Sequence, residues 1–213
     1  MNKWIDISQP LTNDNAHWPR DIPFSFKLTY TKEQTSSVNV GHITTSLHNG
    51  THLDAPFHVH STGKTIDELN INCFIGTALV VDVHHTNKIT TEHLEKYNYD
   101  DVKHVLLRTS FPNSPKRFPK QIPFIDPTIA PFLHKKGIVL LGVDLPSVDP
   151  LDSKALATHH ALNRCNIHIL ENIILGHVTE GLYTLIALPL AIQGADASPT
   201  RAVLQPLEKE NNV

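Results

Sequence analysis

The chain has 213 residues, of which 40% are hydrophobic and 18% are charged, and its formal net charge is −3. This composition excludes a disordered chain, and the length suits one domain with a buried core, which we expect to span residues 1–213. No basic tract is present, so nucleic acid and anionic membrane surfaces are poor candidate partners.

The pattern of apolar residues predicts a strand-rich α/β protein. Residues 38–48 alternate so that every second side chain shares one face of an expected strand. Further strands are expected, in chain order, at 78–83, 102–108, 138–143, 167–170, 182–191 and 202–207. Helices are expected at 91–97, 128–136 and 153–166, the last with Asp152 or Ser153 as its N-cap. The Pro-rich stretch 111–131 is expected to form a long loop inside the domain.

Neither of the longest apolar stretches, residues 73–81 and 182–192, reaches the roughly 18 residues that a membrane span needs. Residues 1–11 contain no apolar core of a secretory signal. The two cysteines, Cys73 and Cys165, lie far apart and lack CxxC spacing, which is typical of a reducing compartment. We therefore expect a cytoplasmic protein with no membrane partner.

The most informative segment is residues 48–58, with the sequence HNGTHLDAPFH. In extended backbone, His52 and Asp54 are two residues apart and point to the same side. Gly50 allows a sharp turn that brings His48 to the same point, while His58 follows nearby. Imidazole and carboxylate suit zinc, and also manganese or iron. The alternative, a solvated turn, explains a lone histidine better than four candidate ligands around one glycine.

A second group of candidate ligands lies downstream, on the expected helix 153–166 and the run that follows it. His159 shares its helix face with apolar residues, whereas His160 lies partly with polar ones, so His159 is the better inward ligand. Both histidines could also lie at the edge of the helix surface. Glu171 sits in an apolar run, where a carboxylate needs a metal or another strong partner.

At residues 48–58 the chain contains the complete motif His-x-Gly-Thr-His-x-Asp-x-Pro-x-His. Here it resembles the bacterial kynurenine formamidase (arylformamidase) group of the cyclase-like metal-dependent hydrolase family. The similarity runs over nearly the whole chain. It includes residues 6–11, 18–19, 142–144, 146–149, the helix with His159, 169–172 and 198–203.

The resemblance implies a single-domain swivelling β/β/α fold, usually dimeric, with one or two zinc ions per subunit, manganese being possible. By position, His48, His52 and Asp54 correspond to the ligands of the first metal. Asp54 also corresponds to a bridge toward a second metal, held by His159 and Glu171.

The resemblance also implies the reaction, in which N-formyl-L-kynurenine and water give L-kynurenine and formate, a step of tryptophan degradation by the kynurenine pathway. His58 resembles the family's proton donor and acceptor, and Trp18 resembles a residue that lines the substrate pocket. A metal lowers the pKa of a bound water toward about 7 and so supplies hydroxide at neutral pH. His58 could then protonate the departing arylamine.

Three other functions are compatible with the sequence. The nearest is another hydrolase of the same family, which would open the isatin ring, a different N-acyl arylamine or a lactone. A polyketide cyclase and a non-catalytic metal-binding module are the others, and His58, which a metal does not obviously need, speaks against the last. No Gly-x-Ser-x-Gly segment occurs, which disfavours a serine hydrolase. Trp4, Phe24 and Phe26 are interpreted as core or interface aromatics.

Overall fold

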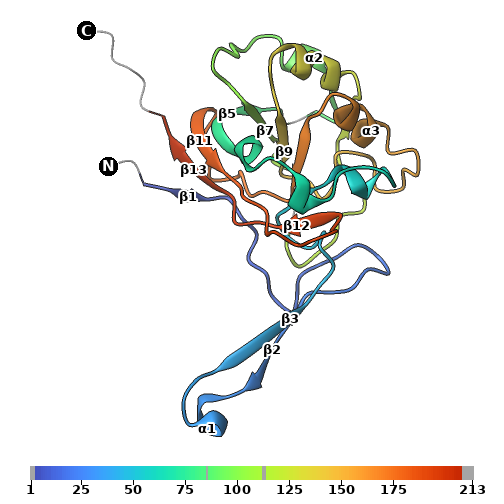
Figure 1. Ribbon diagram of the computed structural model, residues 1–213. Helices are drawn as coiled ribbons and strands as arrows, with labels where there is room; N and C mark the ends of the chain where they lie inside the picture. Colours follow the sequence, from blue (N-terminus) through green and yellow to red (C-terminus); the bar gives the residue numbers. More distant parts are fainter. Residues whose placement is uncertain (1–2, 85, 112–113, 208–213) are drawn as a thin grey trace.

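The computed structural model describes residues 3–84, 86–111 and 114–207 (Figure 1). Its main element is a curled nine-stranded mixed sheet with the order β1-β13-β11-β5-β7-β9-β10-β4-β12. The four central strands run parallel: β5 (Ile75–Asp82), β7 (His104–Arg108), β9 (Leu140–Val143) and β10 (His168–Glu171). Antiparallel strands extend both sides: β11 (Gly181–Ile186), β13 (Val203–Pro206) and β1 (Ile5–Asp6), and β4 (His52–Asp54) and β12 (Ala197–Pro199).

The parallel centre of the sheet is buried on both faces, as its mostly apolar strands require. The helices α2 (Ile129–Lys135) and α3 (Ala157–Arg164) cover one face (Figure 1). At Gly142 a side chain would collide with Leu106, 2.4 Å from the position of its Cβ, so glycine is needed for close packing there. The strand-rich α/β class expected from the sequence is confirmed.

Short elements fill the connections between these strands and helices. They are η1 (Pro56–His58), η2 (Ile66–Glu68), η3 (Ile71–Phe74), β6 (Lys88–Ile89), η4 (Thr91–His93) and β8 (Phe124–Ile125), which pairs with β6. The expected loop 111–131 therefore contains β8 and the start of α2, and its residues 112–113 lie outside the described residues. None of the helices formed by the described residues is long and apolar enough to cross a membrane.

Several predicted elements are shorter than expected, and three of them are shortened for a local reason. The predicted helix 91–97 is only the single turn η4. A separate turn follows at the buried Leu94, whose carbonyl accepts the Tyr97 N–H. The predicted strand 182–191 ends at Ile186, shortly before Pro189, which cannot donate a ladder hydrogen bond. The predicted strand 38–48 is reduced to β3 (Val40–Thr44), since the following residues turn toward the body.

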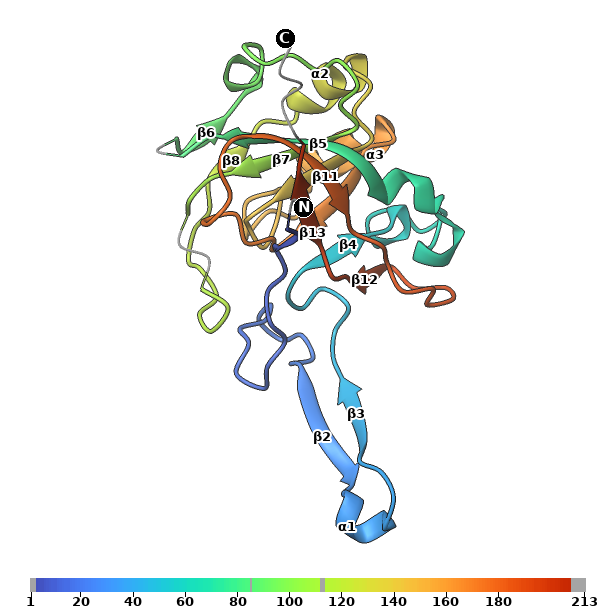
Figure 2. The same cartoon turned by 90° about the vertical axis from the view of Figure 1, so that its left-hand side faces the viewer.

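A two-stranded arm, made of β2 (Ser25–Tyr30) and β3 with α1 (Lys32–Thr35) at its tip, extends away from the body (Figures 1 and 2). Phe26 pairs with Ile43 and Leu28 pairs with Gly41, so these apolar side chains share one face of the arm. All three are about half exposed, at 49%, 57% and 49% for Phe26, Ile43 and Leu28. The arm therefore presents an apolar face that the described part of its own chain leaves uncovered.

Candidate metal centre

The buried part of the site is built by the pairing of β4 with β10. In this antiparallel register Glu171 lies opposite His52, and Ile169 lies opposite Asp54. His52 and Asp54 sit two apart in one strand, and His52 Nε2 lies 3.4 Å from Asp54 Oδ1 and 3.5 Å from Glu171 Oε2. All three side chains are at least 95% buried. Two carboxylates are thus held beside an imidazole without access to bulk water.

The loop before β4 brings His48 to the same point. Gly50 adopts a positive φ of 63°, which glycine tolerates at no steric cost. His48 Nδ1 then lies 3.1 Å from Asp54 Oδ1. The same loop positions the next imidazole, because His52 Nδ1 donates a hydrogen bond to the Gly50 carbonyl at 2.9 Å.

Helix α3 contributes a further side chain to the centre, that of His159. His159 Nε2 lies 3.5 Å from Asp54 Oδ2 and 3.6 Å from Glu171 Oε1. Its Nδ1 donates to Asp149 Oδ2 at 2.7 Å. His160, the other candidate of the pair, instead lies with its ring 6.0 Å from that of His60. The structure therefore brings His159 to the cluster.

The start of α3 differs from the prediction. Its N-cap is Leu156, in a left-handed conformation, rather than Asp152 or Ser153. The carboxylate of Asp149 accepts the backbone N–H groups of Thr158 and His159 at 3.0 and 2.9 Å, and so replaces a side-chain cap. One buried carboxylate thereby holds both the helix end and the imidazole that α3 carries.

Each of the imidazoles of His48, His52 and His159 has a hydrogen-bond acceptor at one ring nitrogen and directs the other nitrogen toward the carboxylates of the cluster. His52 donates to the Gly50 carbonyl, His159 to Asp149, and His48 Nε2 lies 3.0 Å from Asp196 Oδ2. A neutral imidazole that donates through one nitrogen carries a lone pair on the other. Those lone pairs face the carboxylates of Asp54 and Glu171. Lone pairs facing carboxylate oxygens repel unless a cation lies between them.

Other features of the cluster also indicate a missing positive charge. His52 Nε2 and both carboxylate oxygens of Asp54 are buried without a hydrogen bond of normal geometry, which is unusual for buried polar atoms. Burial and the nearby charge of Asp54 raise the pKa of the Glu171 carboxyl. Burial opposes charge on His159, yet the carboxylates of Asp149 and Asp54 raise its pKa to about 10, so without a metal ion the cluster draws a proton onto this imidazole in place of the cation. A divalent cation fits this nitrogen and oxygen donor set.

Asp54 is shared by two groups of possible ligands. Donor atoms of His48, Asp54 and His58 lie within 4.8 Å of one another, and so do those of His52, Asp54 and Glu171. The sequence-based assignment grouped His52 with His48 instead. The geometry therefore offers room around Asp54 for one or two ions, and it brings His58 close enough to compete as a ligand.

The rim of the site is made by His58 and Asp196. His58 lies on η1 with 30% of its side chain exposed, and its Nδ1 is 3.5 Å from Asp196 Oδ2. Asp196 immediately precedes β12, where Ala197 pairs with Asp54. Sequence analysis missed Asp149 and Asp196 as individual residues, although both lie within or next to the stretches that carry the family resemblance. Each candidate ligand imidazole needs a hydrogen-bond acceptor for its other ring nitrogen, and a search for such acceptors could have identified both aspartates.

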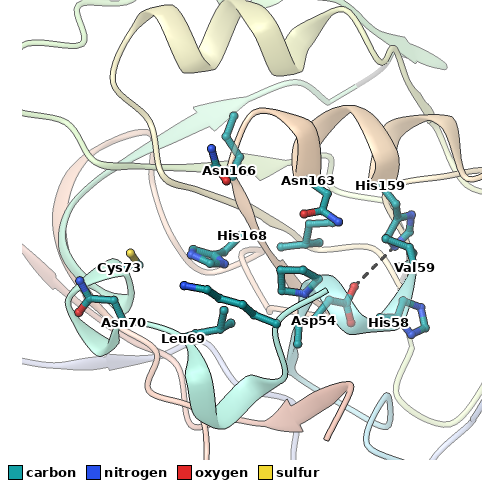
Figure 3. A pocket seen from close by; sticks show the side chains of 15 residues that line it. Asp54, His58, Val59, Leu69, Asn70, Cys73, His159, Asn163, Asn166 and His168 are labelled. Atoms are coloured by element: carbon teal, nitrogen blue, oxygen red, sulfur yellow. Dashed lines mark ion pairs between the residues drawn. The ribbon is translucent and has the colours of Figure 1, made fainter. Parts of the chain in front are cut away.

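Two cavities meet at this centre. One, of about 230 Å³, lies on the side of Trp18, with Leu151 and Leu156 among its lining residues. Trp18 packs against Phe118, with 4.9 Å between ring centroids. The other, of about 240 Å³, is lined at one end by Asp54, His58 and His159 and continues toward His168 and Asn70, and Trp18 is not among its lining residues (Figure 3).

Comparison with known proteins gives consistent matches. Residues 5–150 match the Cyclase family, described as "Putative cyclase". A curated relative, the kynurenine formamidase of Bacillus cytotoxicus, is 52% identical over 206 residues, which cover 97% of this chain and 99% of the relative.

Solved structures share the fold. A potential metal-dependent hydrolase with cyclase activity superposes with a TM-score of 0.81 at 26% identity, covering 98% of this chain and all of the other. Isatin hydrolase A from Labrenzia aggregata superposes with a TM-score of 0.80, covering 97% of this chain and 94% of that chain. At 20% identity, the second likeness concerns the fold alone.

Proposed function

This chain belongs to the Cyclase family, and from that premise we propose that it is a metal-dependent kynurenine formamidase, which hydrolyses N-formyl-L-kynurenine to L-kynurenine and formate. The observation that carries the proposal is the 52% identity to a kynurenine formamidase over almost the full length of both chains. We include in it a single domain over residues 1–213 and a role in tryptophan degradation by the kynurenine pathway. Isatin hydrolysis gains no specific support, because that likeness is one of fold.

We assign the metal ligands to His48, His52, Asp54, His159 and Glu171, with zinc as the expected ion and manganese as the alternative. The support is the convergence of imidazole nitrogens on two buried carboxylates, with His52 Nε2 and both Asp54 oxygens lacking a hydrogen bond. A divalent ion bound there lowers the pKa of water and polarises the carbonyl of the substrate. One or two ions would fit this assignment, with Asp54 shared between them.

His58 is proposed as the acid and base of the reaction. It lies at the rim, partly exposed, with its ring 4.2 Å from that of His48 and 6.0 Å from that of His159. It can accept a proton as water adds to the formyl carbon and return it to the arylamine nitrogen as the C–N bond breaks. Asp196, 3.5 Å from His58 Nδ1, would orient the ring. Trp18 would offer its face to the aryl ring.

A chelation and reconstitution experiment tests the proposed function. Purified protein is stripped with a chelator, and formate release from N-formyl-L-kynurenine is measured before and after zinc or manganese is returned. Stripped protein should be inactive and should regain activity with metal. Its melting temperature should also rise on metal addition, since an ion that binds only the folded state stabilises it. Full activity in chelated, metal-free protein would contradict the proposal.

We further propose a homodimer in which the β2–β3 arm contacts the second copy. A two-stranded hairpin is only marginally stable on its own, and the apolar face of Phe26, Leu28 and Ile43 is uncovered. The body carries a groove of about 620 Å³ whose lining includes the exposed apolar side chains of Leu188 and Leu190. An arm and a groove on the same chain allow a symmetric, self-complementary pair.

Light scattering tests the dimer. The wild type should have the mass of two chains, and the double variant Phe26→Ser and Ile43→Ser should shift toward one chain. Substitution of the polar face, Lys27→Ser, is the matched control and should leave the mass unchanged. A monomeric wild type would overturn the arrangement.

The cytoplasm remains the proposed location, in keeping with two free cysteines, Cys73 and Cys165.

A further inference from the structure

The cavity of about 240 Å³, which His58 lines and Trp18 does not, contains polar side chains that the proposed chemistry does not use. It begins at Asp54, His58 and His159 and continues to His168 and Asn70, with Asn163 beside it (Figure 3). Apolar side chains form much of its wall: Val59, Leu69, Ile167 and Ile169. A molecule bound at the metal centre could therefore extend into this cavity as well as toward Trp18.

The charge in the cavity is arranged with one sign at each end. Among the described residues that line it, Lys64 is the one ammonium, and Asp54 at the metal end is the one carboxylate. The imidazole of His168 stays neutral, because burial and then the charge of Lys64 lower its pKa to about 4. Lys64 makes no side-chain hydrogen bond or ion pair with a described residue. Its positive charge is therefore available to a ligand.

Two amide side chains, those of Asn163 and Asn166, line the same cavity as this lysine. Asn163 lies four residues after His159 on α3, and so shares its helix face. Asn166 follows the end of the helix with a positive φ of 53°. Neither amide makes a side-chain hydrogen bond within the part of the chain that the structure describes. One ammonium and two amides without a hydrogen-bond partner among the described residues, in a cavity that starts at the metal centre, are suited to an anionic oxygen ligand.

We propose that this cavity is a carboxylate-binding subsite, with Lys64 as the cation and Asn163 and Asn166 as amide donors. The inference rests on the proposed function, which supplies two carboxylates. One is the α-carboxylate of the substrate's amino-acid tail, and the other is the product formate. If the α-carboxylate binds here, Lys64 determines specificity for the amino-acid tail. If formate binds here, Lys64 holds the product after hydrolysis.

Two substrates separate these sources. N-formyl-L-kynurenine is compared with 2′-formamidoacetophenone, which keeps the ring, the formamide and the neighbouring ketone but lacks the amino-acid tail. Lys64→Met is measured beside Lys64→Arg, which retains the charge, and beside Lys135→Met, a control at an exposed lysine on α2. Inhibition by added formate is measured for each protein.

If the α-carboxylate binds here, Lys64→Met should lower kcat/KM for N-formyl-L-kynurenine by about 10- to 100-fold, the usual worth of a charge-assisted hydrogen bond. The tail-less substrate should change less than about 2-fold, and Lys64→Arg should restore most of the loss. If formate is the ligand, the two substrates should respond alike while the inhibition constant for formate rises. Unchanged selectivity together with unchanged formate inhibition would overturn the subsite.

The subsite and the proposed function can fail separately. A wild type that releases no formate from either substrate contradicts the function. Calorimetry with L-kynurenine and with formate still tests the subsite in that case, since it needs binding alone. Weaker binding of either carboxylate to Lys64→Met than to Lys135→Met supports the subsite, and equal binding to the two variants rejects it. Asn163→Ala should give a smaller loss in the same direction.

Discussion

The two halves of the candidate centre are built differently. His52, Asp54 and Glu171 lie on paired strands, at least 95% buried. His48, His58 and Asp196 lie on loops or next to an element end, and Asp196 retains 40% of its exposure. Strand pairing fixes the first group through the backbone ladder, whereas the second is held mainly by contacts between side chains. We infer that the buried half anchors the ion, whereas the rim adds His48 as a ligand and supplies the proton carrier and the entrance for substrate.

The largest effect is expected from breaking the buried half. His52→Ala removes a ligand whose orientation the Gly50 carbonyl fixes at 2.9 Å, so metal content and activity should both be lost. His60→Ala, at an exposed histidine of the loop after η1, is the matched control and should retain both. Metal analysis and formate release decide the matter. A His52→Ala protein with full metal content would mean that the buried half does not hold the ion.

The rim should behave in the opposite way. His58→Ala should keep its metal while kcat falls by about 10²–10⁴, the span usual for a lost general acid and base. The loss should shrink across a series of ring-substituted formanilides as the amine becomes a better leaving group, since such amines need less protonation. Metal stoichiometry and rates are measured on the same preparation. Metal loss with an equal rate ratio across the series would make His58 a ligand instead.

A smaller effect is expected at Asp196, which connects the rim to the buried half. Its carboxylate lies 3.0 Å from His48 Nε2 and 3.5 Å from His58 Nδ1. Asp196→Asn should weaken metal affinity or activity by about 10- to 100-fold, as is typical for the loss of an acceptor behind a ligand imidazole. Asp196→Glu should recover part of that loss. Wild-type affinity and activity in Asp196→Asn would remove Asp196 from both roles.

The same contrast explains what could be predicted from the sequence. The proposed ligands on β4 could be identified because alternation along an extended backbone places His52 and Asp54 on one side, and apolar neighbours marked Glu171 as buried. Strand existence was predictable for the apolar central strands, but not their order, because periodicity carries no information about partners.

The residues of the rim could be brought together only by the folded chain and not by a pattern in the sequence. Asp196 is far in sequence from His48, and only the pairing of β12 with β4 brings it there. The N-cap of α3 was wrongly predicted for a similar reason, since Asp149 caps the helix from a loop rather than from the position next to it. Neither contact leaves a local pattern, because each depends on which strands and loops become neighbours.

The smallest expected effect concerns the outer wall of the rim. Trp18 lines the cavity beside His58 and packs against Phe118 at 4.9 Å, so its indole can stack on an aryl ring. Trp18→Ala should lower kcat/KM for N-formyl-L-kynurenine by about 3- to 10-fold, the factor expected for one aromatic pair. A small aliphatic formamide has no ring to stack and should react at nearly the same rate with both proteins. Trp18→Phe should preserve most of the preference, and equal losses on the two substrates would make Trp18 a packing residue for the Phe118 loop instead.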